Sequence, residues 1–500
     1  LSLGRIARAG FVELASARGD LESLAERTGI SSEAWLDALT LAADPDGALG
    51  QLSRAVQDPE GSAELGRLAA DPDGALLLGR LCRLLGASPG LGEFFLRHRT
   101  LLPPVIRRGP RPPRPLDELR ERLLAAVRVD AEGVARLAGE DGWNAIRIGY
   151  RELLAEITLY DLEGPRAQDR FDLVALALSD LAEAAIDASL AVARGTVIEG
   201  HGIGRSFPRA GVLGTRFAVI AMGKCGAEEL NVVSDVDVIF VGESGDPELS
   251  DAQAIEIATR LGTEVMRGLH EYALEPPLWQ VDPNLRPEGK NGPLVRSLDS
   301  HLAYYERWAQ TWEFQALLKA RFIAGDRELG EAYVARTRPL VWASSDRPDF
   351  VGSVQRMRER VTEQLPDDAA EVQLKLGPGG LRDVEFAVQL LQLVHGQGDD
   401  SLRVRGTIAG IDALVLGGYI ARTDAEELAS AYREIRVLEH RLQLRHLRRT
   451  AVLPRDEAGL RWLARASGFA STADGLMKRF EANRRVVREL HLKIFYAPLL

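Results

Sequence analysis

The chain has 500 residues, too many for one compact core, and this length predicts about three domains. Its formal net charge is −11, from 62 Lys and Arg against 73 Asp and Glu, which argues against a protein that tracks a nucleic-acid backbone. The two cysteines, Cys82 and Cys225, exclude a disulfide framework and a zinc site of ordinary spacing, and they indicate a reducing, cytoplasmic compartment.

The N-terminal region, residues 1–205, is predicted to form helix after helix. The sequence of Leu41–Leu49 recurs unchanged as Leu68–Leu76, and in each copy Asp-Pro-Asp-Gly is expected to end one helix before Ala-Leu begins another. The Pro-rich stretch Pro103–Pro115 is a candidate linker. Leu173–Val192 is apolar, but three acidic residues interrupt it, so it predicts a buried helix and no membrane span.

From about Gly214 the pattern changes to short apolar runs rich in β-branched residues. Arg216–Met222 and Val236–Val241 predict two strands, and Leu278–Leu285 is a third candidate, which Pro283 would place at an edge or end early. A helical stretch, Asp251–Tyr272, separates the second strand from the third. This order predicts a small α/β unit.

After about Ser297 the pattern returns to helices. One predicted helix carries apolar residues at helical spacing together with six arginines, which we interpret as a solvated face, the alternative being a docking surface for an acidic partner. We therefore expect a mainly α protein with a small α/β core, in three parts: residues 1–205, 206–345 and 346–500. The arginines are Arg433, Arg436, Arg441, Arg445, Arg448 and Arg449.

The strongest chemical signal is a pair of aspartates, Asp235 and Asp237, at the start of the second predicted strand. Side chains alternate along a strand, so both carboxylates point the same way and repel each other unless a cation lies between them. Hard oxygen ligands suit Mg²⁺, and two such ions can clamp an in-line phosphoryl displacement. Alone, the pair is also typical of solvated aspartates at a strand end.

A glycine-rich turn precedes the pair. Gly223 and Gly226 flank Lys224 directly after the first predicted strand. Such a turn lets backbone N–H groups approach a phosphate while the lysine supplies charge, although a simple tight turn has the same composition. The spacing is not that of a Walker A loop.

A third carboxylate is expected from the next apolar run. Asp282 precedes Pro283, and it either joins the aspartate pair from a neighbouring strand or caps a turn. Arg286 and Lys290 follow in a Gly/Pro-rich loop, where a basic side chain is able to meet a phosphate.

A further turn, Gly377–Gly380, precedes another predicted helix. Arg382 and Glu385 lie in the first turn of this helix, where an acidic residue also favours the helix dipole. Lys375 and Arg382 either line a cleft for nucleotide or protein substrate, with Glu385 beside them, or belong to ordinary helix capping.

These segments resemble the bifunctional glutamine synthetase adenylyltransferase/adenylyl-removing enzymes, within the DNA polymerase β-like nucleotidyltransferase superfamily. The resemblance extends over nearly the whole chain, with Glu229-Leu-Asn231 and Gly380–Asp383 similar to the N-terminal, adenylyl-removing half. His491–Leu500 looks like the link to a second half, so we expect a longer natural protein. The matching segments are Gly223–Phe240, Val281–Val295 with Trp312–Arg321, Leu374–Phe386 and Leu438–Gln443.

The resemblance implies a reaction. Inorganic phosphate would attack the α-phosphorus of AMP linked to a tyrosine of glutamine synthetase, giving ADP and the unmodified synthetase. Asp235, Asp237 and Asp282 would hold Mg²⁺, and Lys224, Ser234, Arg286 and Lys290 would contact phosphate groups of ADP or ATP. A PII-type signalling protein is an expected regulator, and neither nucleic acid nor membrane is an expected partner.

Two rival functions remain open. A uridylyltransferase acting on a PII protein would share the aspartate pair but not the Leu374–Phe386 segment as it stands here. A non-catalytic regulatory module would tolerate loss of a carboxylate, whereas all three carboxylates are present.

Overall fold

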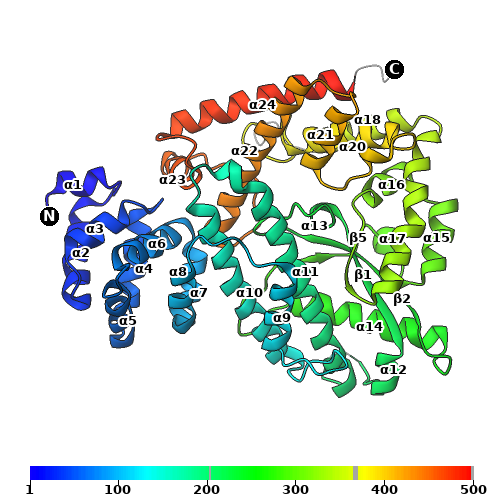
Figure 1. Cartoon of the computed structure of the whole chain (residues 1–500), viewed down its shortest axis with the longest axis horizontal. Helices are drawn as coiled ribbons and strands as arrows, with labels where there is room; N and C mark the ends of the chain where they lie inside the picture. The colour runs from blue at the N-terminus through cyan, green and yellow to red at the C-terminus, as the bar shows by residue number, and fades with distance from the viewer. Residues whose placement is uncertain (202–203, 364–369, 497–500) are drawn as a thin grey trace. The chain divides into compact units, whose positions relative to one another are not determined.

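The computed structural model describes residues 1–201, 204–363 and 370–496; the last four residues of the expected link, 497–500, lie outside this range. Within it the chain is mainly helical with one small mixed sheet, as the sequence predicts. Figure 1 shows the strands in the middle of the green part of the chain, with helices before and after them. No helix in the described ranges is long and apolar enough to cross a membrane.

The elements that build the N-terminal helical region and its continuation are all α-helical or 3-10 helical. They are α1 (Leu3–Arg8), α2 (Leu14–Thr28), α3 (Ser32–Leu39), α4 (Pro45–Ala55), α5 (Pro59–Ala69), α6 (Gly74–Ala87), α7 (Pro89–Arg97), η1 (Arg99–Leu101), α8 (Leu102–Arg108), α9 (Leu116–Ala126), α10 (Gly139–Leu162), α11 (Ala167–Glu199) and α12 (Arg209–Leu213).

The sheet and its helices follow. They are β1 (Thr215–Ala221), α13 (Gly223–Gly226), β2 (Val236–Ser244), α14 (Asp251–His270), β3 (Val281–Asp282), η2 (Gly289–Asn291), β4 (Val295–Arg296), α15 (Leu298–Arg307), α16 (Thr311–Leu317), β5 (Arg321–Gly325), α17 (Arg327–Trp342), η3 (Ala343–Asp346), α18 (Phe350–Glu363), α20 (Leu381–His395), η4 (Asp400–Leu402), α21 (Thr407–Leu416), α22 (Arg422–His446), α23 (Glu457–Ser467) and α24 (Ala473–Phe495).

The repeated Asp-Pro-Asp-Gly sequence starts a helix in both copies. Asp44 caps α4, with its carboxylate accepting from the Gly47 N–H at 2.9 Å, and Pro45 occupies the first turn, where its missing N–H costs nothing. The second copy starts α6 at Gly74. The linker prediction for Pro103–Pro115 is wrong in its first part, because α8 begins there with its prolines in the first helical turn.

The chain divides into two compact units, each assembled from separate segments. Unit 1 contains 1–113, 151–174 and 434–482, and unit 2 contains 114–150, 175–433 and 483–500. One crossing between them falls after Pro113, inside the Pro-rich stretch. The three-part division by residue number stays a prediction.

The sheet in unit 2 has the strand order β3-β2-β1-β5, and β4 also pairs with β2. β1 is antiparallel to β2 and to β5, whereas β3 and β4 run parallel to β2. The first two strands and α14 are confirmed, and the third strand ends at Asp282, directly before Pro283, as its proline predicts.

The two faces of this sheet bury different side chains, because neighbouring residues of a strand alternate. On one face Ala218, Ile220, Ile239 and Val241 join a buried cluster with side chains of α15, α16, α17 and α20. The other face carries Phe217 and Phe240, which stack on each other and pack beside α14. Asp237 has the same parity as Ile239, so it lies on the face that α20 covers.

The arginine-rich C-terminal helix is α22, and the solvated-face interpretation of its arginines is wrong for two of them. Arg436 and Arg441 are fully buried, and Arg441 forms a two-point ion pair with Asp161 of α10 within unit 1. Helical spacing cannot reveal this burial, because the covering residues come from a distant part of the chain.

Candidate functional site

Three aspartates lie together at one end of the sheet. The parallel register between β2 and β3 places Asp237 directly beside Asp282, and Asp235, just before β2, is close enough to act on the charge of Asp237. Adjacent strands are about 4.8 Å apart, so the carboxylates repel each other. Burial, Asp282 and Asp235 together raise the pKa of Asp237 to about 6, against the opposing effect of Lys375 and Arg382.

The glycine turn lies against this carboxylate. Gly223 has φ +53°, and a Cβ there would collide with Asp237 Oδ2. Gly226 has no room for a side chain either, because its Cβ would collide with the backbone carbonyl of Lys319. Lys224, between the two glycines, donates a hydrogen bond to Asn231 Oδ1 at 3.3 Å. Both glycines are thus required for close packing, and the turn brings Lys224 to the edge of the acidic cluster.

The first turn of α20 adds the opposite charge. Arg382 donates to Glu385 Oε2 at 3.0 Å, and Glu385 is buried with its Oε1 atom lacking a hydrogen-bond partner among the described residues. Burial raises the pKa of Glu385, but Arg382, Lys319, Lys224 and Lys375 together hold that pKa well below its usual range. The structure therefore gathers four cations around one carboxylate.

Lys319 is the member of this cluster that sequence reasoning missed. It lies between α16 and β5 and is buried, with its backbone carbonyl against Gly226. Its only sequence signal was its place inside Trp312–Arg321, a segment that carried the family resemblance without a role for any single residue. A buried lysine is expensive unless it is paired, so its burial beside Glu385 indicates a site rather than a packing residue.

In the loop after Asp282, the sequence predicts that Arg286 and Lys290 contact phosphate, but Arg286 bonds to the loop itself. Arg286 is buried and donates to the backbone carbonyls of Pro283, Gly292 and Pro293 at 2.9 to 3.3 Å, so its guanidinium fixes the loop. Lys290 is exposed in η2, and Ser234 is half-buried directly before Asp235. Lys375 and Arg382 act on the charge of Asp237, whereas Arg286 lies within electrostatic reach of Asp282 while its guanidinium is held by its own loop.

A buried network holds the turn that carries Lys375 and Arg382. Asp383 accepts from Arg358 Nε at 2.9 Å and from the Gly379 N–H at 2.6 Å, and its backbone carbonyl accepts from His491 Nδ1 at 2.9 Å. These side chains of Arg358, Asp383 and His491 are each about 2% exposed. The turn before α20 is therefore rigidly placed.

The carboxylates fit Mg²⁺ by their chemistry, although they do not form a closed cage. Within the described ranges, no three His, Cys, Asp or Glu side chains converge tightly enough to enclose a metal ion. Mg²⁺ commonly takes one or two carboxylates and fills its other positions with water and substrate phosphate, so a closed cage is not required. The crowding of Asp237 against Asp282 is the kind of repulsion that a bound cation relieves.

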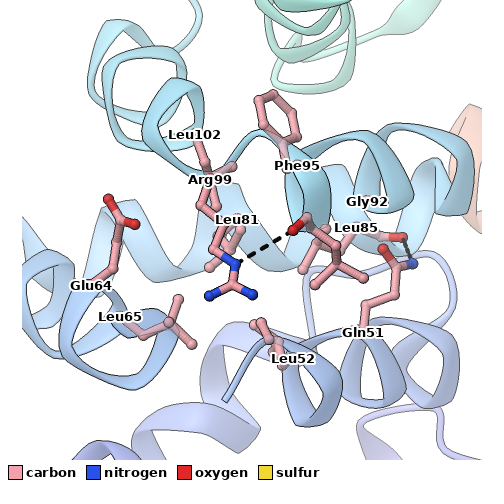
Figure 2. Close-up of a pocket in the computed structure, with 13 residues that line it drawn as sticks. Gln51, Leu52, Glu64, Leu65, Leu81, Leu85, Gly92, Phe95, Arg99 and Leu102 are labelled. Carbon is pink, nitrogen blue, oxygen red and sulfur yellow. Dashed lines mark hydrogen bonds between the residues drawn. The ribbon is translucent and has the colours of Figure 1, made fainter. Parts of the chain in front are cut away.

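A pocket in unit 1 offers no comparable chemistry. Figure 2 shows Leu52, Leu65, Leu81, Leu85 and Phe95 lining it, with the Arg99 guanidinium pointing into its middle and with Glu64 and Gln51 on opposite sides. Gln51 donates to the Leu85 carbonyl at 3.2 Å, and Arg99 pairs with Asp58 outside the pocket. The apolar lining lacks grouped carboxylates, so the candidate site is the one in unit 2.

Two family models match the chain. Residues 78–335 match the glutamate-ammonia ligase adenylyltransferase family, and this match covers the sheet, the three aspartates and Lys319. The chain belongs to this family. Residues 353–495 match the GlnD PII-uridylyltransferase family, and this second match includes Lys375, Arg382 and Glu385. The Leu374–Phe386 segment lies within this second match.

Curated relatives cover the whole chain. A bifunctional glutamine synthetase adenylyltransferase/adenylyl-removing enzyme from Leifsonia xyli is 53% identical over 100% of this chain and 49% of its own length. The same kind of enzyme from Streptomyces coelicolor is 44% identical over 99% of this chain and 47% of its own length. The chain thus spans about half the length of the curated relatives it matches.

Proposed function

We propose that this chain removes AMP from the adenylyl-tyrosine of glutamine synthetase by phosphorolysis, as the N-terminal part of a bifunctional regulatory enzyme. The observation that carries the proposal is the pairing of Asp237 with Asp282 on one sheet face, opposite a cluster of lysines and Arg382. Carboxylates for a cation beside cations for phosphate are what nucleotidyl transfer requires. The relatives' names supply the protein substrate.

In this proposal Asp235, Asp237 and Asp282 hold Mg²⁺, which when bound supplies electrostatic stabilisation of the phosphate oxygens. Lys224 and Lys375 bind and orient the attacking phosphate through their ammonium groups. Glu385 keeps these cations together, because without its charge they would repel one another.

The reaction balances without a further reactant. A phosphate oxygen forms a bond to the α-phosphorus of the AMP group, and the bond from that phosphorus to the tyrosine oxygen breaks. The leaving oxygen takes a proton, giving tyrosine and ADP. Because the attack is in line, the chain's main contribution is to position two anions that repel each other.

The direct test is incubation of the chain with adenylylated glutamine synthetase, inorganic phosphate and Mg²⁺. Chromatography should detect ADP, and mass spectrometry should detect loss of AMP from the tyrosine. Omission of phosphate should stop the reaction. Release of AMP rather than ADP, or no release at all, would contradict phosphorolysis.

The direction of transfer is tested separately. We expect no modification when unmodified synthetase, ATP and Mg²⁺ are supplied, since the opposing activity is proposed to belong to the part of the relatives that this chain does not cover. Rapid adenylylation by this chain alone would contradict the assignment to the removing half while leaving nucleotidyl transfer in place.

The second family match favours one alternative. A match to the GlnD PII-uridylyltransferase family over residues 353–495 supports a PII-type protein as partner or acceptor. If the chain is instead a uridylyltransferase, it should label a PII protein from UTP and leave adenylylated synthetase unchanged. As a regulator only, a PII protein should bind without being labelled.

A further inference from the structure

A small pocket in unit 2 lies behind the segment that carries Lys319. It is lined by Leu317, Leu318 and Ala320 on one side, by residues of α17 on another, and by Arg403 and Arg405 from the segment before α21. The cavity between these side chains is small, about 20 Å³, and it is partly open to solvent. A cavity of this size holds about one or two water-sized groups, so it has room for the oxyanion end of a ligand, and the rest of the ligand would lie in the opening.

The lining is basic and carries no acidic side chain. Its arginines are Arg338, Arg403 and Arg405. Arg403 is well satisfied, because it donates to the Gly396 carbonyl at 2.8 Å and pairs with Asp400 at 2.7 Å. Arg338 is exposed and, among the residues that the structure describes, has no carboxylate partner.

Arg405 is less well compensated. Its carboxylate partner is Glu228, at a distance of 3.7 Å, and its Nε atom is buried without an acceptor in the described part of the chain. Burial lowers the pKa of Arg405, and the charges of Arg321 and Arg338 lower it further, against the effect of Glu228. The pocket therefore carries more positive charge than its neighbours balance.

Trp342 supplies a second buried donor. Its side chain is 6% exposed, its Nε1 atom has no acceptor among the described residues, and the Arg403 guanidinium lies 5.5 Å from the centre of its ring. Buried N–H groups are normally paired, since leaving one without an acceptor costs free energy. Two unpaired donors at one basic pocket indicate that an acceptor belongs there.

We propose that this pocket binds the oxyanion group of a small organic molecule, a carboxylate or a phosphate, with Arg405 and Trp342 as its donors and Arg338 at its entrance. The apolar side chains of Leu317, Val334 and Val341 favour an organic anion over a fully hydrated inorganic ion. Neither the aspartates nor the lysine cluster of the candidate site takes part, so the site does not depend on the proposed function.

Binding of an anion in the pocket should also affect the glycine turn that carries Lys224. The bound anion competes with Glu228 for Arg405, and Glu228 directly precedes Glu229. Glu229 in turn accepts from the Thr407 hydroxyl at 2.9 Å and from the backbone N–H of Thr407 at the start of α21. Loss of the Arg405 contact should therefore loosen residues 223–231, which include Lys224.

Binding is tested by calorimetry on the whole chain, with succinate and glycerol 3-phosphate as separate probes. At least one probe should bind, and the stronger binder identifies the carboxylate or the phosphate class. Arg405→Gln should weaken that binding by about tenfold or more, because a charge-assisted hydrogen bond is lost. Trp342→Phe, which keeps the ring and removes the donor, should weaken it by a smaller factor.

Arg336→Gln is the matched control, because Arg336 is an exposed arginine of the same helix, α17, that pairs with Asp299 and does not line the pocket, so probe binding should be unchanged. Circular dichroism verifies that each variant is folded, and Arg338→Gln, at an exposed position, repeats the test without a risk to folding. No binding of either probe at about 10 mM would overturn the proposal, as would wild-type affinity in both Arg405→Gln and Trp342→Phe. Hydrogen exchange in residues 223–231 should rise with the probe, and unchanged exchange would overturn the competition for Arg405.

Discussion

Two buried groups of charges, one in each unit, are arranged differently. In unit 1 the fully buried Arg441 meets a single carboxylate, Asp161, in a two-point ion pair. In unit 2 the single carboxylate of Glu385 interacts with four cationic side chains. In the same unit the carboxylate of Asp237 lies close to those of Asp282 and Asp235. Paired charges are explained by stability of the fold, whereas concentrations of like charge cost stability and are typical of sites that bind charged ligands. The contrast supports the proposed site in unit 2.

The largest effect should follow removal of one crowded carboxylate. Asp237→Asn should lower turnover by about a thousandfold or more, because one ligand charge of the proposed metal site is lost. The fold should survive, since the change also removes repulsion between Asp237 and Asp282. Initial rates of ADP release measure the loss of turnover, and thermal melting measures whether the fold survives. The control variant is Asp412→Asn, at an exposed position of α21, which should keep the wild-type turnover. If Asp237→Asn turns over at a similar rate to this control, Asp237 is not a ligand of a catalytic metal ion.

The ion pair of unit 1 should show the opposite behaviour, with a large effect on stability. Arg441→Met leaves Asp161 buried without a partner and should cost about 3–5 kcal/mol in the free energy of unfolding. The double variant Arg441→Met/Asp161→Leu should recover most of that loss. Urea unfolding measures both, and a single variant as stable as the wild-type protein would contradict the structural role of the pair.

Acid should weaken unit 2 through a buried histidine. Burial lowers the pKa of His301 to about 4, and its Nδ1 donates to the Ser297 carbonyl at 3.1 Å. The unfolded chain binds this proton near pH 6.5, so stability should be constant above that pH and should fall as the pH decreases toward 4, by about 3 kcal/mol. His301→Asn should flatten that pH dependence in urea unfolding curves. An equally steep dependence in the variant would assign it to other groups.

The smallest effect separates two lysines that sequence alone treats alike. Lys224→Ala should weaken binding of inorganic phosphate by about tenfold, because Lys224 belongs to the cation cluster around Glu385. Lys290→Ala removes an exposed charge and should change the affinity by less than about twofold. Titration calorimetry measures the phosphate affinity of both variants. Equal losses of affinity would mean that Lys290 also contacts phosphate, as the sequence predicts.

Much of the fold could be predicted because it rests on local signals. The alternation of β2 predicts that Asp235 and Asp237 share a face, and Pro283 predicts the early end of β3. β4 has only two residues, too few for any periodicity, and its pairing with β2 is set from outside its own sequence. Sequence reasoning also missed the longer β5, which lies after Ser297, where only helices were expected, although it predicted β3, which is as short as β4.

The sequence by itself determined the residue types of the site and the face on which the first two aspartates lie, because both follow from spacing along one strand. Only the tertiary structure decided that Asp282 stands beside Asp237, that Lys319 joins Lys375 and Arg382 around Glu385, and that Arg286 serves its own loop. These outcomes depend on strand register and on the packing of α16 and α20 against the sheet. Such contacts join residues far apart in the chain, and no local period encodes them.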